Sequence, residues 1–239
     1  MSTLQKMGGI SALICAATYL VSMGLLFSLL APFADPAMDF AQFMDFFLAN
    51  QTTIFIWHLL MYLVNGVFLV FLTLALFERL KAGSQTMGQA ATIFGLIWAV
   101  LVLASGFITL YGWEAIAKLY GSDPTQAATL KLMLDTVTIG LDHSDRFLGC
   151  LWVLLASWAA LRAGVLPRAL NYLGLSIGIP GIISTAFPGL TELGIAFGLG
   201  IILWWIWLGI AMLGSRPSLV VEKASEVEAS HSTLSLAGK

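Results

Sequence analysis

Residues 91–110 have the sequence ATIFGLIWAVLVLASGFITL, an apolar run without a charged side chain. As an α-helix, a run of this length covers about 30 Å, which matches the thickness of the hydrocarbon core of a bilayer. Lipid offers the backbone no hydrogen-bond partners, so a spanning segment must pair its own N–H and C=O groups, as a helix does. This run therefore predicts a transmembrane helix.

Five further apolar runs have similar lengths, and the composition also indicates a membrane protein. Apolar residues make up 59% of the 239-residue chain and charged residues 10%, whereas soluble domains contain about 25% charged residues. The runs do not alternate polar and apolar residues as barrel strands do. We predict an all-α fold, a polytopic transmembrane helix bundle over residues 1–214 that is surrounded by lipid bilayer, with six spans at 9–30, 53–77, 91–110, 141–161, 170–187 and 193–213.

The distribution of basic residues predicts that both termini are cytoplasmic, because Lys and Arg are retained on that side of the membrane. Eight of the eleven basic residues fall on the side of the N-terminus: Lys6, Arg79, Lys81, Arg162, Arg168, Arg216, Lys223 and Lys239. The basic residues form no patch of the kind that binds nucleic acid, so no nucleic-acid partner is expected. Residues 215–239 are rich in Ser and Glu and are expected to form a disordered cytoplasmic tail.

Two connections on the opposite, outer side are expected to be helical. The aromatic segment AMDFAQFMDFF, residues 37–47, has apolar side chains at helical spacing. This spacing suits either a helix lying in the outer interface of the bilayer or a helix packed on the bundle. After the turn SDP at 122–124, a helix from Thr125 onward is expected to continue into the fourth span and to overhang the membrane.

Glycines four residues apart provide small surfaces in the last two spans. Gly174 and Gly178 lie in the fifth span, and Gly194 and Gly198 lie in the sixth. Such surfaces let helix backbones approach closely in lipid. They serve either to pack these two helices within the chain or to bind a membrane-protein partner or a second copy of the chain.

The candidate functional residues lie near one depth at the outer ends of three spans. His58 lies about 8 Å inside the second span, Glu114 follows the third, and the segment DHSDR at 142–146 begins the fourth. Ionisable residues at such depth are costly to desolvate, so they face the bundle interior or water. The candidate ligand-binding residues are His58, Asn65, Glu114, Asp142, His143 and Arg146.

A purely structural role for these residues is also open. Asp142 and Arg146 are four residues apart, so they can pair with each other along a helix. A buried His58 can be satisfied by the carbonyl or hydroxyl of a helix neighbour. The spacing of the histidines matches no metal-ligand motif of the H-E-x-x-H kind.

Three functions fit this pattern. In the first, the polar cluster opens into a cavity, lined by His58, Tyr62, Asn65, Trp98 and Ser105, that binds or transports a small ligand. In the second, a membrane-embedded redox protein or enzyme uses His58 and His143 as ligands of a haem or, with Glu114 or Asp142, of a divalent metal. In the third, the chain is an accessory subunit of a membrane assembly. The sequence contains no P-loop, dinucleotide or nucleophile-elbow motif, which favours a noncatalytic role, and no catalytic residue is assigned.

The chain also resembles a known family. The resemblance is clearest over LWVLLASWAALRAGVLPRALNYLGLSIGIPG at 151–181 and FGLGIILWWIWLGIAML at 197–213, and looser over LALFERL and FGLIWAVLVLASG. These stretches are similar to bacterial six-helix integral membrane proteins classed as a domain of unknown function. The resemblance implies six spans in a bacterial inner membrane and carries no activity. The family pattern is richer in Gly, with an Asn-Glu pair, where this chain has LDHSDRFLGC at 141–150, so the resemblance implies no role for His143 or Arg146.

The predicted orientation is tested with a protease-cleavable tag fused after Lys239. We expect protease added to intact spheroplasts to leave this tag in place and to remove it only after the membrane is opened, because both termini are predicted to be cytoplasmic. The same tag inserted after Gly121, in an outer connection, is the accessible control. Removal of the C-terminal tag from intact spheroplasts would contradict the six-span map.

Overall fold

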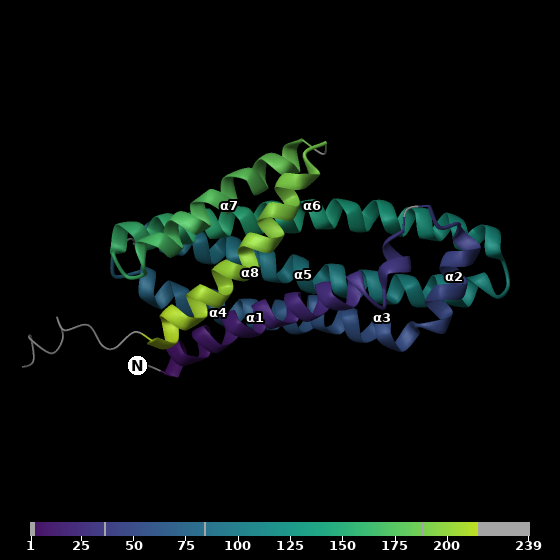
Figure 1. The fold of residues 1–239 in the computed structure, drawn as a ribbon, viewed down its shortest axis with the longest axis horizontal. Helices are drawn as coiled ribbons and strands as arrows, with labels where there is room; N and C mark the ends of the chain where they lie inside the picture. Colours follow the sequence, from purple (N-terminus) through teal and green to yellow (C-terminus); the bar gives the residue numbers. More distant parts are fainter. Residues whose placement is uncertain (1–2, 36, 84, 188, 215–239) are drawn as a thin grey trace, which may run out of the picture.

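The computed structural model describes residues 3–35, 37–83, 85–187 and 189–214, and within these ranges the regular structure is helical (Figure 1). The α-helices are α1 (Thr3–Phe27), α2 (Phe40–Ala49), α3 (Gln51–His58), α4 (Asn65–Leu80), α5 (Gln85–Tyr120), α6 (Pro124–Ala163), α7 (Arg168–Ala186) and α8 (Thr191–Gly214). A 3₁₀ turn, η1 (Ala31–Ala34), follows α1, and a π-helix, η2 (Leu59–Val64), joins α3 to α4.

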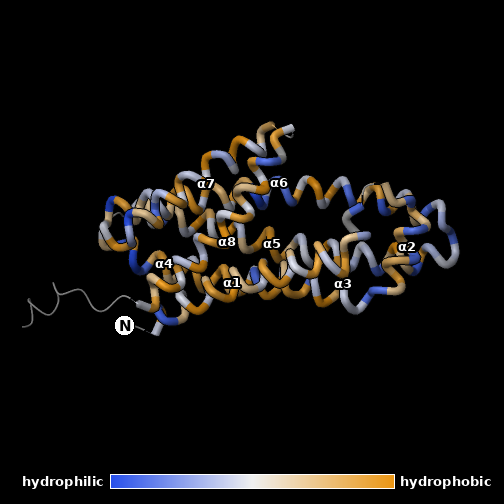
Figure 2. Tube along the Cα trace, in the orientation of Figure 1, coloured by the Kyte–Doolittle hydropathy of each residue, from blue (hydrophilic) through white to orange (hydrophobic). Residues whose placement is uncertain are grey.

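Six helical segments are long and apolar enough to span a membrane: α1, the continuous segment α3–η2–α4, α5, α6, α7 and α8. The predicted all-α fold with six spanning helices is therefore confirmed. The tail predicted at 215–239 lies outside the described residues. Apolar residues dominate along the bundle, and polar residues are more frequent at the two ends of its long axis (Figure 2).

Helices α5 and α6 are much longer than a bilayer crossing requires. They contain 36 and 40 residues, which correspond to about 54 and 60 Å at 1.5 Å per residue. The N-terminus of α6 is defined by Asp123, whose side chain accepts a hydrogen bond from the backbone N–H of Gln126 at 3.0 Å, and by Pro124 in the first turn. A single helix thus runs from the SDP turn through the fourth span, as expected. The two long helices, α5 and α6, extend along most of the length of the molecule (Figure 1).

The α5–α6 contact is built from two tryptophans that each lie over a glycine of the other helix. A Cβ atom added at Gly149 of α6 would lie 2.8 Å from ring atoms of Trp98, and one added at Gly95 of α5 would lie 2.6 Å from Cδ1 of Trp152. The two indole rings are 5.5 Å apart. Each glycine therefore makes room for the tryptophan of the opposite helix.

This pair of tryptophans continues into a larger buried aromatic cluster. Trp98 stacks on Trp205 of α8 at 5.9 Å, Trp205 meets Tyr19 of α1 edge-on at 5.1 Å, and Trp152 meets Trp204 at 5.5 Å. Trp204 and Trp205 are fully buried. They lie in the middle of α8 and pack against neighbouring helices.

The glycines of the last two spans have different surroundings. Gly174 and Gly178 of α7 lie against α6, where added Cβ atoms would meet Ser157 and Leu154. Gly194 of α8 lies beside the side chain of Arg146, and an added Cβ at Gly198 would meet no atom within 4 Å. In this structure the α7 pair therefore serves packing within the chain.

The aromatic segment packs on the bundle as α2, which decides between its two predicted positions. Asp39 caps α2 by accepting a hydrogen bond from the backbone N–H of Gln42 at 2.8 Å. Phe43 and Phe47 are buried against Trp113 in the outer part of α5, with ring centroids 4.7 and 5.3 Å away. These contacts form a cap at one end of the bundle, which we call the outer cap because the sequence predicts that end to be the outer one.

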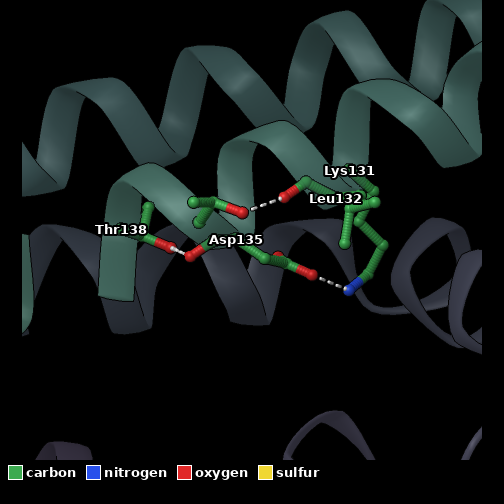
Figure 3. A network of polar contacts seen from close by, with 5 residues as sticks. Lys131, Leu132, Asp135 and Thr138 are labelled. Carbon is green, nitrogen blue, oxygen red and sulfur yellow. Dashed lines mark hydrogen bonds and ion pairs between the residues drawn. The ribbon is translucent and has the colours of Figure 1, made fainter. Parts of the chain in front are cut away.

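Lys131 joins α6 to this cap. Its ammonium group lies 4.7 Å from the ring centre of Phe43, while its Nζ is 2.6 Å from a carboxylate oxygen of Asp135 (Figure 3). Thr138, one turn further along α6, donates a hydrogen bond from its hydroxyl group to the backbone carbonyl of Asp135. The ion pair orients the lysine, so that its charge faces the aromatic ring.

The α5–α6 contact predicts opposite effects for two glycine substitutions on α6. We expect Gly149→Ala to destabilise the protein by about 1–3 kcal/mol, because its methyl group would overlap Trp98. Gly140→Ala is the matched control: a Cβ there meets nothing within 4 Å, and alanine favours the helix by up to about 1 kcal/mol. Unfolding titrations in mixed detergent micelles measure both. Equal stability of the two variants would contradict the packing described.

Candidate functional site

A cavity of about 220 Å³ lies inside the bundle, between α1, η2, α5, α6 and α8. We call it the central cavity. Its walls combine aromatic, aliphatic and charged side chains with two glycines. The lining residues are Tyr19, Met61, Tyr62, Trp98, Val102, Asp142, Asp145, Arg146, Gly194, Phe197, Gly198 and Ile201.

The wall formed by η2 depends on a local change in helix geometry. Between α3 and α4 the backbone widens to a π-helix over six residues, and Met61 and Tyr62 of this segment line the cavity. Gly106 of α5 permits the close approach, because an added Cβ would lie 2.5 Å from Cβ of Tyr62. π-helical turns inside α-helices are rare and frequently occur at functional sites.

The carboxylates of the cavity come from one face of α6. Asp142 and Asp145 are three residues apart, so both side chains point the same way from the helix. The indole N–H of Trp98 donates a hydrogen bond to Oδ1 of Asp145. The tryptophan that locks α5 to α6 therefore also orients a carboxylate in the cavity.

Arg146 lies next to these carboxylates in sequence, and its guanidinium group reaches towards α8. Its Nη1 lies 3.0 Å from the position that a Cβ of Gly194 would take. Among the residues that the structure describes, no ion pair links Arg146 to Asp142, although the two are four residues apart on α6. The cavity thus contains two carboxylates and one guanidinium that are not paired off along the helix.

The candidate residues predicted from the sequence do not all lie in the central cavity. Asp142 and Arg146 line the central cavity, as do the predicted lining residues Tyr62 and Trp98. Asp145, to which the sequence assigns no role of its own, joins them.

Asn65 and His143 line neither of the two cavities described here. Asn65 is fully buried and joins α4 to α1, where its Nδ2 donates to the backbone oxygen of Cys15 and to Oγ1 of Thr18. His143 lies one residue from Asp142 on α6.

His58 and Glu114 meet in a second, larger cavity of about 690 Å³, which we call the outer groove. It lies between α3 and the outer part of α5, beside the outer cap. Its lining residues are Phe47, Leu48, Gln51, Thr52, Ile54, Phe55, His58, Leu110, Tyr111, Trp113, Glu114, Ala117 and Lys118. The residues of the predicted polar cluster are therefore divided between two sites.

The metal-binding alternative needs several ligands at one point. Within the described ranges, no three His, Cys, Asp or Glu side chains gather where they could hold a metal ion. His58 lines the outer groove and His143 lines neither cavity, so the two histidines predicted as haem or metal ligands do not face a common space among the cavities described.

Comparison with known proteins gives one finding. The family described as a domain of unknown function (DUF4386) matches residues 7–213, which include all six spanning helices. No curated protein and no solved structure matches the chain.

Proposed function

The chain belongs to this DUF4386 family, and because a domain of unknown function carries no activity to transfer, we propose a function from the central cavity: noncatalytic binding, and carriage across the membrane, of a small organic cation. The observation that carries this proposal is the excess of carboxylate over guanidinium in a cavity within an apolar helix bundle. Ionisable residues inside membrane-spanning helices are expensive and typically mark ligand or ion pathways.

The charges support a cation as the ligand. The lining contains the carboxyl groups of Asp142 and Asp145 but a single guanidinium, that of Arg146, so one carboxylate has no cationic partner among the lining residues. An isolated charge in such surroundings is strongly unfavourable unless a partner compensates it. A cation bound in the cavity supplies that partner. We place the cation next to Asp145, whose carboxylate Trp98 holds in place by a hydrogen bond.

The size and the aromatic walls support a small organic ligand. The volume of about 220 Å³ is below the range of about 300–1,000 Å³ typical of sites for drug-sized molecules. Tyr19, Tyr62 and Trp98 contribute aromatic surfaces beside the carboxylates. Aromatic faces attract ammonium groups, which further favours a cation with an apolar portion.

The proposal also covers the membrane in which the protein lies and its orientation there. The protein functions in a bacterial inner membrane with both termini in the cytoplasm, supported by eight of eleven basic residues on one side and by the family resemblance. The central cavity then lies towards the outer half of the spans, since Asp142 begins the predicted fourth span from that side.

Charge selectivity is the first test of the central cavity. Isothermal titration calorimetry in mild detergent compares n-butylammonium with n-butanol, which has a similar size and no charge. We expect the ammonium ion to bind and Asp142→Asn or Asp145→Asn to weaken its binding at least about tenfold, because each variant removes a counter-charge from the wall of the cavity. Asp135→Asn is the control, since its carboxylate pairs with Lys131 outside the cavity.

Two results would overturn the proposal. One is equal binding of butanol and butylammonium. The other is a protein that co-purifies in fixed ratio while neither probe binds, which would instead support an accessory subunit. Uptake of butylammonium by proteoliposomes then separates transport from binding alone.

Filling the cavity is a second, independent test. We expect Gly198→Leu to abolish butylammonium binding while the protein stays folded, because an added Cβ at Gly198 meets no atom within 4 Å and the side chain would occupy the cavity. Gly24→Leu is the matched control, since Gly24 also has free space and lines neither cavity. Calorimetry measures binding, and size-exclusion chromatography measures folding. Unchanged affinity in Gly198→Leu would place the ligand elsewhere.

A further inference from the structure

The outer groove has the dimensions and walls of a binding site for an apolar molecule. Its volume of about 690 Å³ lies within the range of about 300–1,000 Å³ typical of small-molecule sites. Phe47, Ile54, Leu110 and Trp113 provide apolar wall surface. The groove extends along α5 from Leu110, where the predicted third span ends, so it lies at the level where the bilayer meets water.

His58 contributes a largely buried imidazole side chain to the wall of this groove. The side chain is 2% exposed, and its Nδ1 lies 2.9 Å from the backbone oxygen of Ile54. A carbonyl oxygen only accepts hydrogen bonds, so Nδ1 carries the hydrogen and Nε2 of the neutral ring is an acceptor. The described residues provide no hydrogen-bond partner for Nε2.

Neighbouring aromatic rings fix the orientation of this imidazole. Tyr62 stacks on it with centroids 5.7 Å apart, and Trp57 meets it edge-on at 4.8 Å. The indole N–H of Trp57 in turn donates to the backbone oxygen of Ser22 at 2.9 Å. The imidazole is therefore held in one orientation at the wall of the groove.

The charges of the groove favour an uncharged ligand. Glu114 and Lys118 are its two charged residues, and their charged groups lie 2.6 Å apart, four residues apart on α5. Because this pair is neutral as a whole, an ionic headgroup finds no excess counter-charge in the groove. The central cavity, with its excess carboxylate, has the opposite character.

The geometry points to the outer groove as a second binding site, for an uncharged, bilayer-dissolved amphiphile whose hydroxyl group donates a hydrogen bond to Nε2 of His58. The apolar body of the ligand packs against the aromatic and aliphatic walls. A hydroxyl group gains a hydrogen bond to Nε2 that a purely apolar molecule cannot form, which gives the site its selectivity. This inference concerns a different site from the central cavity and is independent of the proposed cation binding.

The test compares 4-octylphenol with its methyl ether, 4-octylanisole, which has a similar shape and cannot donate a hydrogen bond. Equilibrium dialysis against protein in phosphatidylcholine nanodiscs, corrected with empty nanodiscs, measures saturable binding. We expect the phenol to bind roughly three- to tenfold more tightly than the ether, because the phenol can form one additional hydrogen bond, to Nε2 of His58. The anion 4-octylbenzoate is expected to bind more weakly than the phenol.

Two variants assign the effect to the groove. His58→Phe retains an aromatic ring beside Tyr62 but has no acceptor nitrogen, so the preference for phenol over ether should disappear. Thr52→Trp, at an exposed position of the wall, fills the groove and should abolish saturable binding of both probes. Ile56→Trp is its control, because Ile56 is exposed on the same helix and does not line the groove.

Three results would overturn the inference. The first is equal affinity of the wild-type protein for the phenol and the ether, and the second is a preference for the phenol that persists in folded His58→Phe. The third is a tightly bound phospholipid, seen by native mass spectrometry, that neither probe displaces, because the groove would then hold a bilayer phospholipid.

Discussion

The reciprocal packing of Trp98 over Gly149 and of Trp152 over Gly95 is the contact on which the rest of the structure depends. In lipid, burying apolar side chains between helices gains little from the hydrophobic effect, because the acyl chains are equally apolar. Association then requires close packing, where many small dispersion gains add up. Two indole rings placed on two glycine backbones provide such packing at the centre of the longest helices.

The same contact connects packing with the polar interior. Trp98 lies against Gly149 and stacks on Trp205, and its N–H group donates a hydrogen bond to Asp145. The carboxylate is thus held by a residue that cannot move without breaking the α5–α6 contact. A pre-oriented charge of this kind loses little conformational entropy when it meets a partner. Both this packed core and the π-helix η2 therefore contribute to the lining of the central cavity.

Much of the fold follows from the sequence because lipid restricts the possibilities. A long apolar run has few options besides a helix, and the six predicted spans are all found. Helix ends are less accurate: the third span is predicted to end at Leu110, yet α5 continues to Tyr120, because the cap formed by α2 covers residues such as Trp113. Local packing, which hydropathy does not describe, stabilises this extension.

The candidate site could be predicted only in part. Hydropathy gives the depth of a residue but not the rotation of its helix, so His58 and Asp142, predicted at one level, line different cavities. Met61 and Tyr62 of the π-helix η2 line the central cavity but not the outer groove, and the segment LLMYLV contains neither glycine nor proline to mark the π-helix. The glycine that accommodates it, Gly106, lies on another helix. Asp145 becomes recognisable as a site residue only once its position relative to Trp98 is known.

The lipid-facing side of α6 has a consequence for how the molecule sits in its membrane. Large apolar side chains are exposed on this helix from Leu132, 68% exposed, to Trp158, 51% exposed. The interval of 26 residues corresponds to about 39 Å, against a hydrocarbon thickness of about 30 Å. The predicted fourth span, residues 141–161, accounts for about 30 Å of this length, so the apolar surface extends into the part of α6 that overhangs the membrane. A thicker bilayer covers more of this surface than a thin one, and hydrophobic matching therefore links α6 to the thickness of the host membrane.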